Sequence, residues 1–296
     1  MKSLHSLLGL LFLLGVCASC GKVQKQASFS DASAVAVSVT KDYPGVVMIL
    51  IPGGGLCTGT FISPRAVLTA AHCTPRAGSY SVLSSFGSFV TSHYEKFGEG
   101  VVEDPNDIAI LMFDKNYANA EEGQIHPIGT SVRAGETVQI VGYGCNDLSA
   151  RTGSGKKRKG TNQIETVNDY IELASPDSIP SMHSDSRGIL GPSNRAGSCF
   201  GDSGGPMFQT QKGNIAIVGA THAGGTDGNT IVSQYIDLNR ADNLDFIHRV
   251  DSRHSLQVFD TCIMNECKYQ GAFMQITTFL TWIWTSIQGL FFSLWQ

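Results

Sequence analysis

Short runs of β-branched and aromatic residues fill the middle of the chain, and Gly, Pro, Asn and Asp separate them. Runs of this length and composition are typical of strands, and turn residues at this spacing are typical of antiparallel sheets. The sequence shows no long segment with a 3.6-residue period between these runs, so it predicts an all-β barrel or sandwich. The predicted strands are Ala34–Thr40, Val46–Ile51, Ile108–Phe113, Thr137–Tyr143, Ile215–Ala220 and Ile231–Leu238.

The start of the chain has the pattern of a secretory signal peptide, predicted over residues 1–19. Lys2 precedes an apolar run at residues 7–16, which is too short to span a membrane, and a stretch of small residues follows. The segment from Cys17 to Gly21 resembles a bacterial lipobox, in which Cys20 would become the lipidated first residue. Of the eight cysteines, removing Cys17 and lipidating Cys20 leaves six to pair, whereas simple secretion leaves one unpaired. We expect an exported protein, with two alternatives: a lipoprotein of the outer membrane, periplasm or cell surface, or a secreted form.

The remaining chain divides into a polar tether at residues 20–33, a domain at 34–255 and an extension at 256–296. Residues 145–198 are rich in Gly, Ser and Asn, and we interpret them as long loops. A short helix is expected at Asn243–Val250. The extension lacks charge after Lys268, and its apolar segment is expected to dock on the domain, lie on a membrane or contact a partner.

Composition excludes some classes of function. With 296 residues and 42% hydrophobic content, the chain can bury a sizeable core. Only 16% of the residues are charged and the net charge is −4, so the basic surplus of a nucleic-acid-binding protein is lacking. The one basic run, Lys156 to Lys159, is interpreted as a solvated loop.

Three segments carry candidate chemistry: residues 59–73 (GTFISPRAVLTAAHC), 106–111 (NDIAIL) and 201–206 (GDSGGP). A serine hydroxyl is a poor nucleophile until an imidazole accepts its proton, and a buried carboxylate orients that imidazole. His72, Asp107 and Ser203 each have an ordinary structural explanation when considered alone. Together, in this order and within these segments, they predict a catalytic triad.

These three segments resemble those of the trypsin/chymotrypsin-like serine peptidases over roughly residues 34–250. The resemblance implies two packed six-stranded β-barrels, at about residues 34–130 and 135–250, with the triad in the cleft between them. It also implies an oxyanion hole formed by the N–H groups of Gly201 and Ser203. Protein or peptide substrates are implied, and neither a metal nor a cofactor is.

The resemblance also suggests disulfides and a specificity pocket. The expected pairs are Cys57 with Cys73, Cys145 with Cys199, and Cys262 with Cys267. The pocket residues are expected to be Gly197, Ser198, Ala223 and Ser233. Without a carboxylate among them, small or apolar substrate side chains are favoured, because a buried cation would lose its hydration unpaired. Asp227 would reverse this preference if its loop folded into the pocket.

Two alternative functions remain at this point. Residues 201–205 also fit the G-x-S-x-G nucleophile elbow of an α/β-hydrolase esterase, with Asp237 and His248 completing its triad. A catalytically inactive binding module is the other alternative. It arises because no activation motif supplies an N-terminal amine to pair with Asp202, as happens in trypsin-like zymogens.

Overall fold

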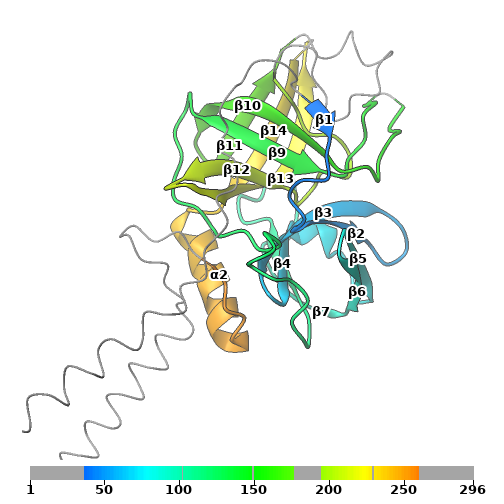
Figure 1. Ribbon diagram of the computed structural model, residues 1–296. Helices are drawn as coiled ribbons and strands as arrows, with labels where there is room; N and C mark the ends of the chain where they lie inside the picture. The colour runs from blue at the N-terminus through cyan, green and yellow to red at the C-terminus, as the bar shows by residue number, and fades with distance from the viewer. Residues whose placement is uncertain (1–36, 102, 149, 177–194, 229, 260–296) are drawn as a thin grey trace, which may run out of the picture.

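The computed structural model describes residues 37–101, 103–148, 150–176, 195–228 and 230–259. The predicted signal peptide and tether, Cys20, most of the extension, and the pair Cys262 and Cys267 lie outside these residues. The described strands form two antiparallel sheets that pack against each other, with a helix beside them (Figure 1). The predicted all-β, trypsin-like class is confirmed.

The first sheet contains seven strands in the order β6-β5-β2-β3-β4-β8-β7. This sheet is a half-barrel. Its edge strands, β6 and β7, do not pair with each other in the described residues, so the barrel is not closed. A single 3₁₀ turn, η1 (Ala71–Cys73), follows β4. The strands are β2 (Val46–Leu50), β3 (Leu56–Ser63), β4 (Ala66–Thr69), β5 (Tyr80–Ser84), β6 (Gly87–Thr91), β7 (His93–Phe97) and β8 (Ile108–Met112).

The second sheet is closed, because β9 pairs with both β10 and β12. Its six barrel strands are joined by a short strand, β1, which pairs with β10. Residues 37–39 therefore belong to the second sheet, although the sequence predicted them in the first barrel. The strands are β1 (Val37–Val39), β9 (Thr137–Gly142), β10 (Arg158–Val167), β11 (Tyr170–Ser175), β12 (Pro206–Gln211), β13 (Asn214–Asp227) and β14 (Thr230–Asp237).

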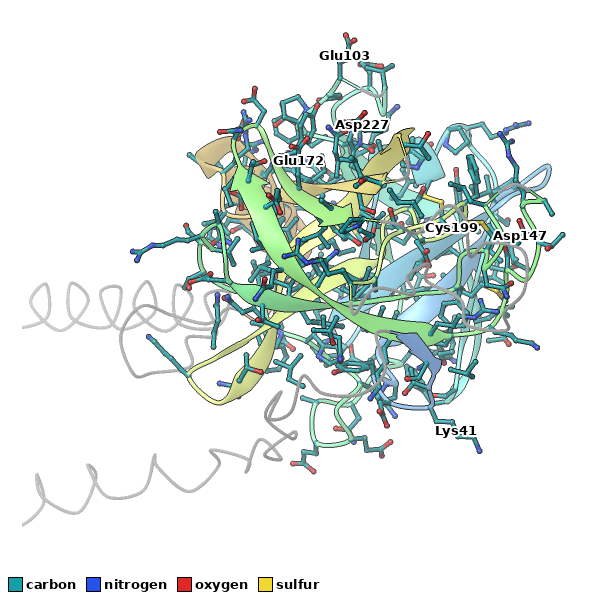
Figure 2. All side chains as sticks on the ribbon, turned by 90° about the horizontal axis from the view of Figure 1, so that it is seen from above. Lys41, Glu103, Asp147, Glu172, Cys199 and Asp227 are labelled. Carbon is teal, nitrogen blue, oxygen red and sulfur yellow. A yellow bond between two sulfur atoms is a disulfide. The ribbon has the colours of Figure 1, made fainter. Side chains whose placement is uncertain are left out.

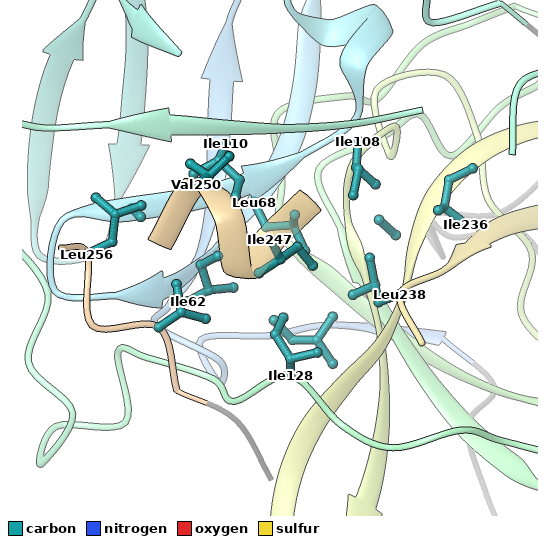
Figure 3. Close-up of a cluster of buried hydrophobic side chains, with 14 of the residues drawn as sticks. Ile62, Leu68, Ile108, Ile110, Ile128, Ile236, Leu238, Ile247, Val250 and Leu256 are labelled. Carbon is teal, nitrogen blue, oxygen red and sulfur yellow. The ribbon is translucent and has the colours of Figure 1, made fainter. Parts of the chain in front are cut away.

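One hydrophobic cluster joins the two sheets (Figure 3). The first sheet contributes Ile62 and Leu68, and the second contributes Ile236, all almost completely buried. Burying one such side chain contributes about 1.5–3 kcal/mol to folding. The cluster therefore holds the two sheets in a fixed relation, and any site between them inherits that rigidity.

The helix α2 (Ala241–His254) contacts both halves of the molecule. Its Ile247 and Val250 are buried in the cluster between the sheets, and Phe246 stacks on Phe97 of β7 at 5.3 Å. The predicted helix, Asn243–Val250, lies within it. Among the described residues, α2 is the longest helix, and no helix there has the length and apolar character needed to cross a membrane.

The basic run at residues 156–159 is not the solvated loop that we predicted. Lys157 and Arg158 are buried, and Lys157 donates from Nζ to the carbonyl of Tyr43 at 2.8 Å. Arg158 donates to the carbonyls of Gly144 and Gly153 at 2.9 and 2.8 Å. Because backbone carbonyls supply the partners, no acidic residue in the sequence signals this burial. The predicted loops at 145–198 likewise contain β10 and β11.

His126 is another buried ionisable group. Its ring centroid lies 6.0 Å from that of Tyr43 and 4.7 Å from that of Phe208, and these two aromatic rings stack on each other. Burial lowers the pKa of His126 to about 4, although a hydrogen bond to the backbone of Ile215 opposes the shift. The native state therefore resists protonation of this ring, while the unfolded chain does not.

We predict that His126 destabilises the fold in acid. The unfolded imidazole binds a proton below about pH 6.5 and the native one only below about pH 4, so stability falls across that window by about 3 kcal/mol. Urea unfolding at several pH values, compared between the wild type and His126→Gln, should show a smaller loss for the variant. Parallel curves for the two proteins would contradict the prediction.

Candidate active site

His72 and Asp107 are brought together by two paired strands. Thr69 at the end of β4 lies opposite Ala109 near the start of β8. His72 follows Thr69 by three residues and Asp107 precedes Ala109 by two, so both side chains emerge at the same edge of the sheet. The backbone N–H of His72 donates to Asp107 Oδ1 at 2.8 Å, and His72 Nδ1 lies 2.6 Å from Oδ2.

The Asp107 carboxylate is completely buried, while the His72 side chain is 29% exposed. A second imidazole also reaches this carboxylate: His222 Nδ1 lies 2.6 Å from Asp107 Oδ2. Burial acts to raise the pKa of Asp107, but the hydrogen bonds from His222 and His72 outweigh it and hold the pKa below its usual range. The carboxylate is therefore ionised at neutral pH.

Two groups of side chains in the described residues have the composition of a metal site. His72, Asp107 and His222 form one, but Nδ1 of each histidine lies only 2.6 Å from Asp107 Oδ2, and ligands of one zinc ion are separated by roughly 3 Å or more. Cys57, Cys73 and His72 form the other, and there the two sulfurs are bonded to each other. The first group is therefore held by hydrogen bonds between its side chains, and the second contains a disulfide.

Ser203 lies in the turn that precedes β12, and the first sheet holds this turn in place. The N–H of Thr58 on β3 donates to the carbonyl of Ser203 at 2.9 Å, and the Thr58 hydroxyl donates to the carbonyl of Gly201 at 2.8 Å. Gly201 has φ +100°, which favours glycine. Thus β3, which leads toward His72 through β4, also fixes the backbone of the serine turn.

Some hydrogen-bonding groups of this turn have no partner among the described residues. Among the described residues, neither the N–H of Gly201 nor that of Ser203 donates to a protein acceptor. The Ser203 hydroxyl likewise has no hydrogen bond to His72 or to another described residue. Catalytic hydrogen bonds are often long or poorly aligned without substrate, so this geometry is compatible with a nucleophile.

Two disulfides brace the site. Cys57 is bonded to Cys73, which links β3 to the turn that carries His72. Cys145 is bonded to Cys199, and the N–H of Cys145 donates to the carbonyl of Phe200 at 2.9 Å (Figure 2). The loop after β9 is therefore attached to the serine turn, as the sequence predicted for these two pairs.

Asp202, beside the serine, has protein partners. Its carboxylate is buried and accepts the N–H groups of Gly144 at 2.7 Å and Cys199 at 2.9 Å. Burial raises the pKa of Asp202 to about 6, while these hydrogen bonds and the charge of Arg158 oppose the shift. Arg158 also donates to the carbonyl of Gly144, the residue that binds Asp202. The Asp202 carboxylate thus has partners within the protein, although the sequence identifies no N-terminal amine to pair with it.

The expected pocket residues lie together on neighbouring segments. The N–H of Ser198 donates to the hydroxyl of Ser233 at 2.8 Å, and a side chain at Gly197 would contact Ser175 and Ser233. Ala223 is on β13, opposite Gln234 of β14. Asp227 is exposed and lies opposite Thr230 at the hairpin end of β13 (Figure 2). The three atoms nearest to a Cβ at Gly197 thus belong to two hydroxyls, those of Ser175 and Ser233, and to Ile231.

Sequence reasoning missed three residues of the site: Thr58, Ser175 and His222. Thr58 precedes the predicted motif at 59–73 by a single residue, so an extended motif would have included it. Ser175 lies in the region that we interpreted as loops. His222 follows the predicted strand Ile215–Ala220 closely, and a histidine at a strand end is the only signal that it gives.

The fold, with its closed barrel and half-barrel, is that of the trypsin-like proteins. A family model described as Trypsin matches residues 35–244, and the chain belongs to this family.

The chain is also similar to known peptidases and to a solved structure. A putative peptidase of Corynebacterium glutamicum is 25% identical over 158 residues, which cover 53% of this chain and 50% of the relative. The chain thus spans about half the length of this relative. Brachyurin of Leptuca pugilator is 26% identical over 68% of this chain and 93% of its own. A solved Glu endopeptidase matches with a TM-score of 0.53 and 18% identity, covering 74% of this chain and 97% of that one.

We predict that Gly204→Ala disrupts the serine turn. A Cβ there would lie 2.1 Å from Thr69 Oγ1 and 2.6 Å from the backbone nitrogen of Ala70, at a φ of +75°. Overpacking and the left-handed backbone together should cost roughly 2–4 kcal/mol of unfolding free energy. Gly225→Ala is the control, because no atom lies within 4 Å of its added Cβ. Equal urea midpoints for the two variants would rule out this account.

Proposed function

We propose that this protein is a serine endopeptidase that cleaves protein or peptide substrates through His72, Asp107 and Ser203. The observation that supports it best is the pair of hydrogen bonds from His72 to the buried Asp107, since they orient the imidazole with Nδ1–H toward the carboxylate. That tautomer leaves Nε2 as an acceptor, which is what a general base for a serine hydroxyl requires.

In the proposed mechanism, His72 Nε2 takes the proton of Ser203 Oγ while this oxygen attacks the substrate carbonyl. The imidazolium then gives the proton to the leaving amine, and an acyl-enzyme remains on Ser203. Water, activated by the same imidazole, releases the product and restores the enzyme. Asp107 stabilises the imidazolium throughout, because the carboxylate is ionised and 2.6 Å from Nδ1.

The N–H groups of Gly201 and Ser203 are the proposed oxyanion hole. Both lack a protein acceptor in the described residues, and two bonds from Thr58 fix the carbonyls of the same two residues. Donors that are held in advance do not need to reorganise as negative charge develops on the substrate oxygen. Removing one such donor typically costs about 3–4 kcal/mol of transition-state stabilisation.

The two alternatives have less support. An esterase with a nucleophile elbow needs alternating strands and helices, and the described residues form two antiparallel sheets instead. The inactive-module alternative arose from the missing partner for Asp202, and the N–H groups of Gly144 and Cys199 now supply partners. We therefore propose activity that does not need a new N-terminal amine at Asp202.

We also propose that the protein is exported, either secreted or anchored through a lipid on Cys20, with the apolar C-terminal tail as a further means of membrane attachment. The signal-like pattern at residues 1–19 motivates this proposal. The two disulfides agree with it, because such bonds persist in oxidising compartments.

The first prediction from this function is covalent labelling of Ser203 by a fluorophosphonate. Labelling should be absent in Ser203→Ala, and His72→Ala should reduce peptide turnover by several orders of magnitude, since the serine would lose its base. Mass spectrometry of the labelled peptide identifies the site. Correctly folded, fully processed wild type with neither labelling nor hydrolysis would support the inactive-module alternative instead.

The second prediction is cleavage after small or apolar residues. In the proposed pocket, a Lys or Arg side chain would meet hydroxyls and carbonyls only, whereas an apolar side chain gains about 25 cal/mol per Å² buried. Digestion of a peptide library measures the preference. Asp227→Asn should leave it unchanged, because Asp227 is exposed. Dominant cleavage after Lys or Arg that this variant abolishes would show that Asp227 reaches the pocket.

A further inference from the structure

His222 is the second imidazole on the Asp107 carboxylate, and the proposed triad does not require it. Its side chain is only 2% exposed, and its Nδ1 lies as close to Oδ2 as that of His72, at 2.6 Å. The sequence separation between His222 and Asp107 is 115 residues, and the two come from different sheets. This contact is thus a direct polar link between the second barrel and the triad.

A β-bulge directs His222 toward Asp107. Along β13, Thr221 lies opposite Tyr235 and Ala223 lies opposite Gln234, so His222 is the extra residue between two consecutive partners. An extra residue of this kind bends the strand and turns its side chain away from the regular alternation. The ring also stacks on Tyr170 of β11, with centroids 5.2 Å apart and planes 4° apart. Both features hold the ring in one orientation.

The hydrogen bonds around Asp107 determine the tautomer of both rings. An ionised carboxylate can only accept, so both Nδ1 atoms must carry hydrogen. Oδ1 accepts the backbone N–H of His72, and Oδ2 accepts the two imidazoles. Without His222, the buried Oδ2 would keep His72 as its one imidazole donor. The carboxylate would then be less strongly held and less strongly stabilised in its charged form.

We propose that His222 is a positioning residue, whose Nδ1–H keeps the Asp107 carboxylate ionised and oriented toward His72. This inference rests on the proposed peptidase function. The proposal assigns the role to a single atom of His222. A substitute that keeps a hydrogen-bond donor at the position of Nδ1 should preserve turnover, and a ring of similar size without that donor should not.

Two variants separate the donor from the ring. His222→Phe keeps an aromatic ring to stack on Tyr170 and removes the donor, whereas His222→Asn keeps an amide N–H close to the position of Nδ1 and removes the ring. We expect kcat of His222→Phe to fall by about ten- to a hundredfold with little change in KM, the effect of losing one hydrogen bond to a charged group. His222→Asn should retain kcat within a few-fold. Full activity in His222→Phe, or an equal loss in both variants, would overturn the proposal.

A measurement without turnover tests the hydrogen bond itself. In ¹⁵N-histidine-labelled Ser203→Ala, we expect two downfield, slowly exchanging Nδ1–H signals, and only the His72 signal in the double variant with His222→Phe. Should that double variant fail to fold, the spectrum of Ser203→Ala alone still decides, because a single signal there overturns the proposal. Absence of fluorophosphonate labelling in the wild type would instead count against the peptidase function.

Discussion

The buried charge of Asp107 is the constraint on which the candidate site depends. An ionised carboxylate without access to water is stable only when donors surround it, and here the donors come from three places: the backbone of His72, its ring, and the ring of His222. These groups belong to a 3₁₀ turn of the first sheet and a strand of the second. One carboxylate thereby couples the geometry of both sheets to the imidazole that it orients.

Such polar geometry requires a rigid frame, and the apolar cluster between the sheets supplies it. Ile62 and Leu68 on one side meet Ile236 and α2 on the other, so a shift of one sheet would open gaps in a close-packed interior. Thr58 and the Cys145–Cys199 disulfide attach the serine turn to this frame, and the Cys57–Cys73 disulfide attaches the turn that carries His72. Packing and disulfides thus position the segments that carry the site, and hydrogen bonds orient the individual groups within it.

Local patterns in the sequence predicted the strands well where apolar residues alternate or run together, as at β2, β8, β9 and β14. The motifs around His72, Asp107 and Ser203 located the candidate chemistry for the same reason, since each is a contiguous segment. The bulge at His222 depends instead on pairing with another strand, and the burial of Lys157 and Arg158 depends on which backbone carbonyls accept their hydrogen bonds. Backbone acceptors exist at every residue, so composition alone gives no sign of which ones are used.

The position of α2 has a consequence for biosynthesis. The helix comes late in the described chain, after all strands of both sheets, yet its buried face completes the cluster that joins the sheets. A nascent chain that has not yet emerged beyond Val250 exposes the apolar side chains of this cluster, and it lacks the packing that sets the distance between its two halves. The packing between the two sheets is therefore completed only when α2 has been synthesised. Chains interrupted before α2 therefore expose apolar surface that favours aggregation.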